Sequence, residues 1–404
     1  MRIHKNIVQA VVKGLEEIFG NNAHADQIVK KQIKLDRRWG ARDRRFIAES
    51  IYDIVRWWRW YLAIGELNEQ DTQVYTNILA VYLREKNIEF PEWFQVDIPD
   101  SATLGLNKIK FGNELKFSAS IPDWLINIGN KEVGEIWRRE ITALNQPTDV
   151  VLRVNKLKTN TSNLINSLRI EGLEVEELID FPDALILKNR VDLNQIKSFK
   201  SGLFEVQDAA SQLVAPFTKA KSGMTVIDAC AGAGGKTLHL AAQMNNSGRI
   251  LSLDVEKSKL AELENRCQRA GCRNVSTHLV HAQQINELRN QADILLIDAP
   301  CSGLGVLRRK PDTKWKMNPE RIEELKELQE KILDEYKVML KPGGSLVYVT
   351  CSILTSENED QIAKFLVKNK EEYILEDEKK VLPSEGFDGF YMARLRKSSI
   401  TSKN

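Results

Sequence analysis

Two cysteines are placed where a sheet protein could use them for chemistry. Cys301 follows the apolar segment Ile294–Asp298, and Cys351 follows the apolar segment Ser345–Val349, so two candidate strands each end near a thiol. In a doubly wound parallel sheet, ligands bind outside the carboxyl ends of the strands, and paired strands lie about 5 Å apart. A single cysteine at a strand end is commonly a small buried hydrophobe. Two in matching positions, facing one ligand crevice, instead favour a functional role for the thiols.

A glycine-rich turn follows an earlier candidate strand. Its residues are Cys230, Ala231, Gly232, Ala233, Gly234, Gly235 and Lys236. Glycines at a strand-to-helix turn let the backbone approach a nucleotide-like ligand, and the next helix offers free N–H groups. A phosphate-binding P-loop would need glycine at Cys230, and a dinucleotide fingerprint would need glycine at Thr237. S-adenosylmethionine (SAM) is the third interpretation, and Asp254, at a later strand end, suits the ribose of SAM and of NAD equally.

These motifs need elements to position them, and after Gln207 strands alternate with helices. The candidate strands are Thr225–Asp228, Ile250–Asp254, Ser276–Val280, Ile294–Asp298 and Ser345–Val349. The candidate helices are Lys236–Gln243, Lys257–Ala270 and Glu320–Leu340. This alternation predicts an α/β domain with a parallel sheet. Upstream, the candidate strands Val150–Asn155 and Leu185–Leu187 and the candidate helix Thr161–Glu171 indicate a small α/β module.

The first 90 residues or so have the pattern of helices. Ile3, Ile7, Val11 and Leu15 recur every four positions, as on one buried helix face. The window Lys30–Arg59 holds ten basic and four acidic residues. A solvated helix face and a phosphate-binding surface both agree with this excess of basic residues.

A second basic segment lies between Gly305 and Lys316. Its cations are Arg308, Arg309, Lys310, Lys314 and Lys316, and only Asp312 opposes them. We predict a mobile basic loop that contacts RNA phosphates, with a simple solvated loop as the equal alternative for each residue.

Composition limits the class of protein. The chain has 404 residues, of which 42% are hydrophobic and 28% are charged, enough for two or three domains with full cores. A net charge of +2 excludes a uniformly basic coat for nucleic acid. Five cysteines in so long a chain indicate reduced thiols and a cytoplasmic protein. Because no apolar run approaches about 18 residues, we expect no membrane partner.

The combination of motifs resembles the Sun/Fmu (RsmB-like) family of SAM-dependent RNA (cytosine-5)-methyltransferases. The resemblance covers most of the chain and rests mainly on the glycine-rich turn and on two cysteine motifs, Asp298–Gly303 and Thr350–Ser352. It implies a class I SAM-methyltransferase (Rossmann-like) catalytic domain over residues 206–404. It further implies a small α/β RNA-binding subdomain over 119–205 and a mostly helical, NusB-like RNA-binding domain over 1–118.

The resemblance also assigns roles. Cys351 would be the nucleophile that adds to carbon 6 of cytosine, and Cys301 would assist release of the adduct. Asp298 would hydrogen-bond or protonate N3 of the base, with Lys236 holding Asp298 in place. The cofactor SAM would be bound by Cys230, Ala231, Gly232, Ala233, Gly234, Gly235, Lys236, Asp254 and Asp298, and no metal is expected.

One position departs from the family pattern, because His281 stands where the family usually carries an aspartate for the adenine end of SAM. The expected substrate is 16S rRNA, and tRNA is the alternative. A non-catalytic RNA-binding ribosome-assembly factor and an NTPase that uses Gly235, Lys236 and Thr237 are the alternatives from other functional classes. The sequence indicates neither the target cytidine nor the oligomeric state.

Overall fold

The chain forms two compact units in a computed structural model that describes residues 4–189 and 191–399. The first, called here the helical unit, contains residues 1–146 and 306–319; the second, the sheet unit, contains residues 147–305 and 320–404. The position Ile3 of the helical pattern lies outside the described residues. None of the helices in the described part of the chain has the length and apolar character that a membrane span requires.

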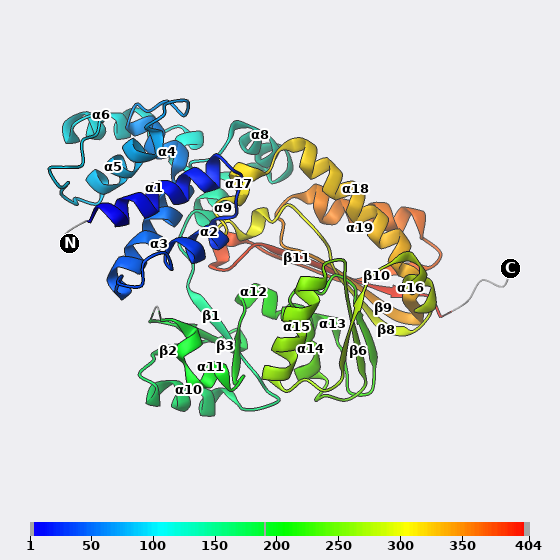
Figure 1. The fold of residues 1–404 in the computed structure, drawn as a ribbon. Coiled ribbons are helices and arrows are strands. Elements are labelled where there is room, and N and C mark those ends of the chain that lie inside the picture. Colours follow the sequence, from blue (N-terminus) through cyan, green and yellow to red (C-terminus); the bar gives the residue numbers. More distant parts are fainter. Residues whose placement is uncertain (1–3, 190, 400–404) are drawn as a thin grey trace. The chain divides into compact units, whose positions relative to one another are not determined.

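The helical unit confirms the predicted mostly helical N-terminal region (Figure 1, blue to cyan). Its helices are α1 (Lys5–Phe19), α2 (Ala25–Gln32), α3 (Ala41–Arg56), α4 (Trp58–Ile64), α5 (Val74–Glu85), α6 (Ser101–Phe111), α7 (Leu115–Ser118), α8 (Asp123–Glu132), α9 (Trp137–Leu144) and α17 (Thr313–Lys316). The four-residue period of α1 has its expected effect, because Ile7, Val11 and Leu15 are all buried in one core with α3 and α5.

The segment 306–319 belongs to the helical unit, so the predicted mobile basic loop is wrong for two of its lysines. Lys314 is fully buried, and its Nζ donates to Arg56 O at 2.8 Å and to Asn145 Oδ1 at 2.9 Å. Lys316 Nζ pairs with Asp312 at 3.0 Å. Buried amines need partners of this kind, so these charges serve packing rather than RNA contact.

Further hydrogen bonds hold the same segment inside the helical unit. Trp315 Nε1 donates to Val55 O at 2.7 Å, and Ala25 N donates to Asp312 Oδ2 at 3.1 Å. Of the five cations that the predicted loop would expose, only Arg309 and Lys310 lie at the surface.

The sheet unit begins with a small antiparallel sheet that corresponds to the predicted α/β module. Its strands, in spatial order, are β2 (Val175–Leu178), β3 (Phe181–Leu187), β1 (Val150–Val154) and β4 (Phe204–Val206). The helices α10 (Thr161–Ile170) and α11 (Lys197–Lys200) accompany it. Leu152, Leu164 and Phe204 meet in its core.

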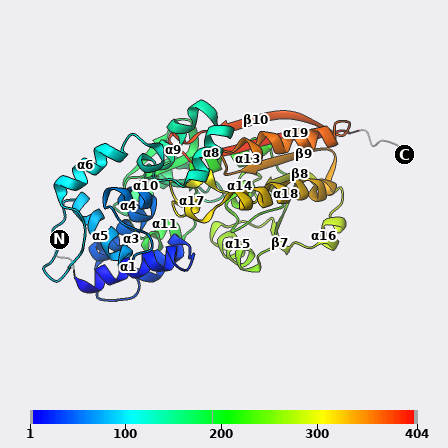
Figure 2. The ribbon, with the colours of Figure 1, turned by 90° about the horizontal axis from the view of Figure 1, so that it is seen from above.

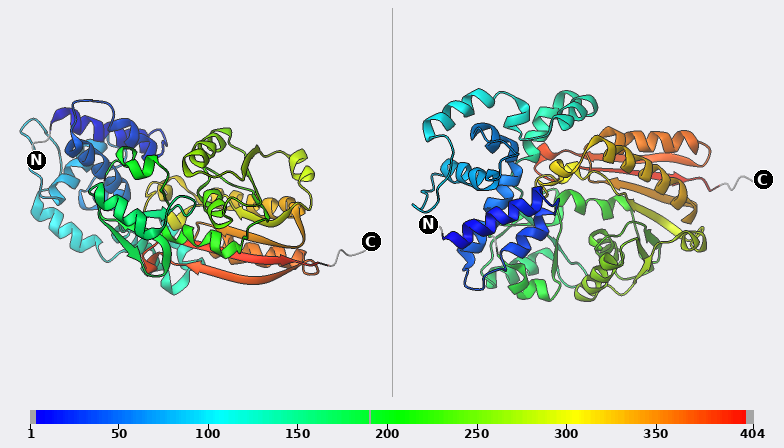
Figure 3. Two further views of the ribbon diagram at one scale, coloured as in Figure 1. Left: turned by 90° about the horizontal axis from the view of Figure 1, so that it is seen from below. Right: turned by 45° about the horizontal axis from the view of Figure 1, so that its top comes forward.

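A seven-stranded sheet forms the centre of the sheet unit, with order β10-β11-β9-β8-β5-β6-β7. The strands are β5 (Thr225–Asp228), β6 (Arg249–Asp254), β7 (Val275–Leu279), β8 (Ala292–Asp298), β9 (Leu340–Thr350), β10 (Tyr373–Val381) and β11 (Phe390–Lys397). The five strands from β9 to β7 are parallel, while β11 and β10 continue the sheet antiparallel along one edge (Figure 3, orange to red). This mostly parallel α/β sheet confirms the predicted Rossmann-like fold class.

Successive side chains of a strand point to opposite faces of the sheet, and here the side chains on both faces are apolar. Helices therefore cover both faces. They are α12 (Ala209–Gln212), α13 (Val214–Thr218), α14 (Gly235–Gln243), α15 (Lys257–Ala270), α16 (Ala282–Glu287), α18 (Pro319–Tyr336) and α19 (Glu359–Lys368). On β5, Ile227 packs in the core with α18 and α19, and Val226 packs in the other core with α13 and α14. Figure 2 shows α18 and α19 running along the same face.

Candidate active site

The two predicted thiols meet at the carboxyl ends of neighbouring strands. As the sequence predicted, β8 and β9 are neighbouring parallel strands, and Asp298 lies opposite Val349. The loops that follow these strands bring Cys301 Sγ to 3.4 Å from Cys351 Sγ. This distance is that of a thiol that donates a hydrogen bond to a second sulfur.

The pKa values of the two thiols move in opposite directions. The hydrogen bond from Cys301 lowers the pKa of Cys351 and Lys236 also lowers it, whereas burial, Asp298 and Asp388 raise it. The same hydrogen bond, together with burial, raises the pKa of Cys301 well above its ordinary value. These opposite shifts favour Cys351 as the thiolate of the pair and hence as the nucleophile.

Lys236 and Asp298 form an ion pair beside the thiols, as predicted. Lys236 Nζ lies 2.5 Å from Asp298 Oδ2, and these residues come from the first turn of α14 and the end of β8. Burial lowers the pKa of Lys236, but the charge of Asp298 and its hydrogen bond to the lysine have the larger combined effect. The pKa of Lys236 is therefore raised. Asp298 Oδ1 accepts no hydrogen bond from the described residues, so it remains available to a ligand.

The glycine-rich turn lies between β5 and α14 and is fixed by Asp254 from the neighbouring strand. Asp254 Oδ2 accepts from Gly232 N at 2.8 Å, and its Oδ1 accepts from Glu256 N at 2.8 Å. Gly232 and Gly234 both have positive φ, which glycine adopts without strain. A Cβ at Gly232 would meet no protein atom within 4 Å, so the turn leaves open space beside the backbone. These features fit a nucleoside-like cofactor held by Asp254 and the turn.

The remaining predicted cofactor residues, Cys230, Ala231, Ala233 and Gly235, lie within this same turn. Ala231 N donates to Leu253 O at 2.9 Å, and Ala233 O accepts from Arg266 Nη1 at 2.7 Å. Their backbone groups thus shape the turn.

Arg153 supports the turn from the small sheet, a role that the sequence did not reveal. It is buried on β1 and donates from Nη1 to Gly235 O at 2.7 Å and to Gln207 Oε1. Burial lowers the pKa of Arg153 to about 10. The sequence signal for this role was an arginine within the apolar strand Val150–Val154. A charged side chain is buried in a strand only where other groups can pair with it or accept its hydrogen bonds.

His281 begins a helix in place of the aspartate that the family usually carries. Its side chain caps α16, with Nδ1 accepting from Gln284 N at 3.2 Å. The ring is thus engaged by the backbone of its own helix.

Asp228, at the end of β5, makes stability depend on pH. It is fully buried, Oδ1 has no partner among the described residues, and burial raises the pKa from its ordinary 3.8 to about 7 despite the hydrogen bond from Thr237 at 2.6 Å. The folded state therefore holds this proton more tightly than the unfolded chain. The contribution of protonated Asp228 to the free energy of unfolding is fully present below about pH 4, and it is lost as the pH rises through 7.

We expect the substitution Asp228→Asn to remove this dependence. Relative to the wild type, the variant should gain roughly 2–3 kcal/mol in free energy of unfolding between pH 5 and pH 8. Denaturant unfolding at both pH values measures the gain. Parallel stability curves for the two proteins would show that Asp228 is ionised throughout.

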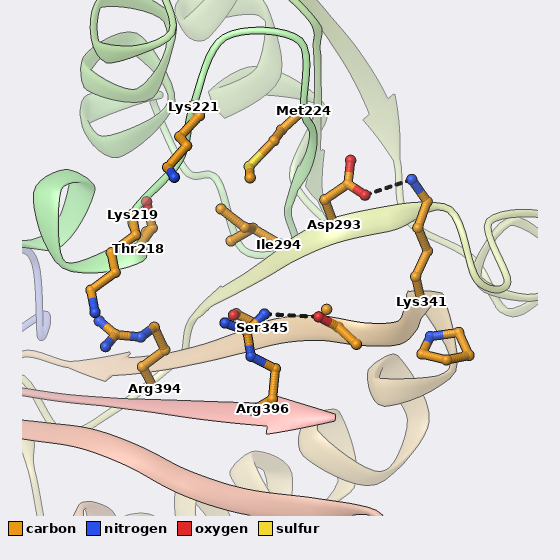
Figure 4. A pocket seen from close by; sticks show the side chains of 13 residues that line it. Thr218, Lys219, Lys221, Met224, Asp293, Ile294, Lys341, Ser345, Arg394 and Arg396 are labelled. Atoms are coloured by element: carbon orange, nitrogen blue, oxygen red, sulfur yellow. Dashed lines mark hydrogen bonds and ion pairs between the residues drawn. The ribbon is translucent and has the colours of Figure 1, made fainter. Parts of the chain in front are cut away.

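A separate cavity of about 270 Å³ lies at the opposite end of the same strands (Figure 4). It is lined by Thr218, Lys219, Lys221, Met224, Asp293, Ile294, Lys341, Pro342, Gly343, Gly344, Ser345, Arg394 and Arg396. Three of its cations bind carboxylates: Lys341 pairs with Asp293, Arg394 with Glu376 and Asp377, and Arg396 with Glu376. None of the predicted site residues lies there. Within the described residues, no three His, Cys, Asp or Glu side chains are grouped to hold a metal ion.

Comparisons with known proteins match two successive parts of the chain. A family model described as 16S rRNA methyltransferase RsmB/F matches residues 216–396, and a model described as an RsmF/B-like ferredoxin-like domain matches residues 121–194. Ribosomal RNA small subunit methyltransferase B of Pasteurella multocida is 37% identical over 292 residues, which are 68% of this chain and 65% of that protein. The probable methyltransferase B of Bacillus subtilis is 33% identical over 304 residues, which are 70% of this chain and 68% of that protein. The match spans about two thirds of these relatives.

Two solved structures share the fold. The crystal structure of PH0851 has a TM-score of 0.81 at 24% identity and covers 98% of this chain and 99% of its own. A methyltransferase homolog protein from Pyrococcus horikoshii has a TM-score of 0.62 at 26% identity, covering 70% of this chain and 98% of its own.

Proposed function

Because the chain belongs to the RsmB/F family of 16S rRNA methyltransferases, we propose that it methylates carbon 5 of a cytidine in 16S rRNA with SAM as methyl donor. The observation that carries the chemistry is the pair of thiols 3.4 Å apart beside the Lys236–Asp298 ion pair. A methyl group on an exocyclic amine would need no such nucleophile. Carbon 5 of cytosine does, because it is a poor nucleophile until the ring is activated.

Cys351 activates the ring by covalent addition. Its thiolate forms a bond to carbon 6, and the electron pair of the C5–C6 double bond shifts toward N3. Carbon 5 thereby becomes nucleophilic. The hydrogen bond from Cys301 to the Cys351 sulfur lowers the pKa of Cys351 and so favours its thiolate. The base must be unpaired or flipped out to reach the sulfur, which costs a few kcal/mol of stacking.

Asp298 stabilises the charge that develops on N3. Lys236 fixes Asp298 Oδ2 at 2.5 Å, which leaves Oδ1 to pass a proton taken up from solvent to N3 as the charge develops. This is general acid–base assistance at a fixed position. When the adduct eliminates, the proton returns from N3 to Asp298 Oδ1.

The residues of the glycine-rich turn fit SAM, which supplies an electrophilic methyl group when it is bound. Asp254 keeps lone pairs on both oxygens beyond its two backbone contacts, so it can accept from ribose hydroxyls. The open space beside Gly232 admits the ligand to the backbone. After methylation the carbon 5 proton is lost to solvent, and the electrons of that C–H bond restore the C5–C6 double bond and expel the Cys351 thiolate. Cys301 assists this release through the hydrogen bond that its thiol donates to the departing sulfur.

We assign RNA binding to residues 1–118 and 119–205, and catalysis to residues 206–404. Four cations of the predicted basic window support the first assignment, since they are exposed and have no ion-pair partner among the described residues: Lys34, Arg37, Arg42 and Arg45. Such cations bind RNA phosphates in a salt-dependent way. A cytoplasmic location would place the protein with nascent rRNA.

Methyl transfer from labelled SAM tests this function. We expect the protein to label naked 16S rRNA or the small ribosomal particle, and digestion followed by mass spectrometry to find 5-methylcytidine at one position. Transfer to tRNA alone would redirect the substrate assignment. SAM binding without any transfer to these RNAs would favour the assembly-factor alternative.

A further inference from the structure

A buried carboxylate outside the predicted site lies directly behind the two thiols. Glu357 ends the short 3-10 turn Thr355–Glu357 after β9 and has no exposed surface. Its Oε1 accepts from Ser302 N at 2.8 Å and from Gln329 Nε2 at 3.0 Å. Its Oε2 accepts from Ser302 Oγ and Ser352 Oγ, each at 2.5 Å. Four donors therefore satisfy one buried carboxylate, which is what burial of its charge requires.

The two serines are the residues that immediately follow the two cysteines. Each hydroxyl also accepts from the backbone of its own loop, Ser302 Oγ from Leu304 N at 3.4 Å and Ser352 Oγ from Leu354 N at 3.1 Å. One carboxylate oxygen thus joins the turn after Cys301 to the turn after Cys351.

Other elements hold Glu357 itself in place. Gln329 of α18 donates from the same Nε2 to Pro300 O at 2.9 Å, next to Cys301. Tyr348 Oη donates to Glu357 O at 2.8 Å. The carboxylate is therefore fixed relative to β9, α18 and both cysteine loops.

Charge distinguishes the two thiols. The groups that act on them are Lys236, Asp298, Asp388 and Glu357. After the hydrogen bond to Cys351 and burial, the negative charge of Glu357 raises the pKa of Cys301 further. On the other sulfur, Asp298 and Asp388 raise the pKa of Cys351 and Lys236 lowers it. Glu357 and Lys236 therefore favour the shared proton on Cys301, against the effect of the two aspartates.

We propose that Glu357 is a positioning residue that clamps the two cysteine loops together and keeps the shared thiol proton on Cys301. This inference rests on the proposed function for its role in methylation. The clamp maintains the distance between the sulfurs, and the charge prevents Cys301 from becoming the nucleophile.

Alkylation by iodoacetamide, followed by peptide mapping, tests the proposal without RNA or SAM. We expect Cys351 to react before Cys301 in the wild type. The substitution Glu357→Gln removes the negative charge and turns an amide N–H₂ toward groups that donate hydrogen bonds to the carboxylate in the wild type. The ratio of Cys351 to Cys301 alkylation should therefore fall by about tenfold or more. Glu357→Asp retains the charge and should retain most of the preference. The matched control Glu359→Gln removes a half-buried carboxylate, paired with Lys380 at 2.9 Å, and should leave the preference unchanged.

An unchanged labelling ratio in folded Glu357→Gln would overturn the proposal, even if its melting temperature falls. Should that variant fail to fold, Ser302→Ala and Ser352→Ala separate the clamp from the charge. Each should keep Cys351 as the labelled thiol while RNA methylation slows, with little change in KM; wild-type methylation rates in both would refute the clamp. A wild type that shows the labelling preference but no methylation would count against the proposed function alone.

Discussion

Cys301→Ala is expected to remain covalently attached to its RNA, whereas Cys351→Ala is expected to form no adduct. The first variant keeps the nucleophile and loses the group that assists release, so the Cys351–C6 bond persists. The second loses the nucleophile, and its methylation should fall by more than about a thousandfold. Denaturing gels of both proteins, with and without RNase, measure the result as a slower band that RNase removes.

The fully matched control is Cys267→Ala, which removes a buried thiol of α15 in the same unit. It should behave as the wild type in both assays. An adduct in Cys351→Ala but not in Cys301→Ala would exchange the two roles. Sequencing of the trapped RNA from Cys301→Ala would identify the target cytidine.

Asp298→Asn is expected to lower kcat by about a hundredfold or more, the usual contribution of general acid–base assistance. The amide cannot share a proton with N3, and Lys236 loses the carboxylate that lies 2.5 Å from its Nζ. Single-turnover methylation with saturating RNA and SAM measures the chemical step, and calorimetry measures SAM binding separately because Asp298 is also a predicted cofactor residue.

The same strand supplies the control for this prediction. Asp293 is the second residue of β8 and pairs with Lys341 at 2.7 Å. The substitution Asp293→Asn therefore also removes a carboxylate–lysine pair. This residue lies at the opposite end of the strand from the thiols, so its substitution should leave kcat unchanged. Equal losses in the two variants would show that strand stability, not proton sharing, determines the rate.

The sequence predicted the parallel part of the sheet because buried parallel strands have continuous apolar runs. Thr225–Asp228 and Lys257–Ala270 have the bounds found in β5 and α15, while β7 begins and ends one residue earlier than predicted. The edge strand β10 was missed because most of its residues are exposed and its charged segment lacks apolar alternation. The thiol pair was predictable because strand ends in a parallel sheet share one edge.

Other features of the site depend on contacts between distant residues, which local pattern does not encode. Arg153 binds Gly235 O across 82 positions, and Glu357 binds Ser302 across 55. Lys314 looked like a surface cation because its neighbours are basic, yet its partners, Arg56 and Asn145, lie far away in the sequence. Composition indicates that such charges exist but not where their partners are.

Residues 306–319 return to the helical unit, and this affects the order in which the two units can finish folding during translation. The ribosome completes residues 1–146 first, but the amine and indole that bind Arg56 O and Val55 O belong to Lys314 and Trp315. At about 5–20 residues per second, those groups arrive roughly 10–30 s later. The first unit to leave the ribosome is thus completed only after most of the second has been synthesised. Until then, these carbonyls lack the two partners that complete the helical unit.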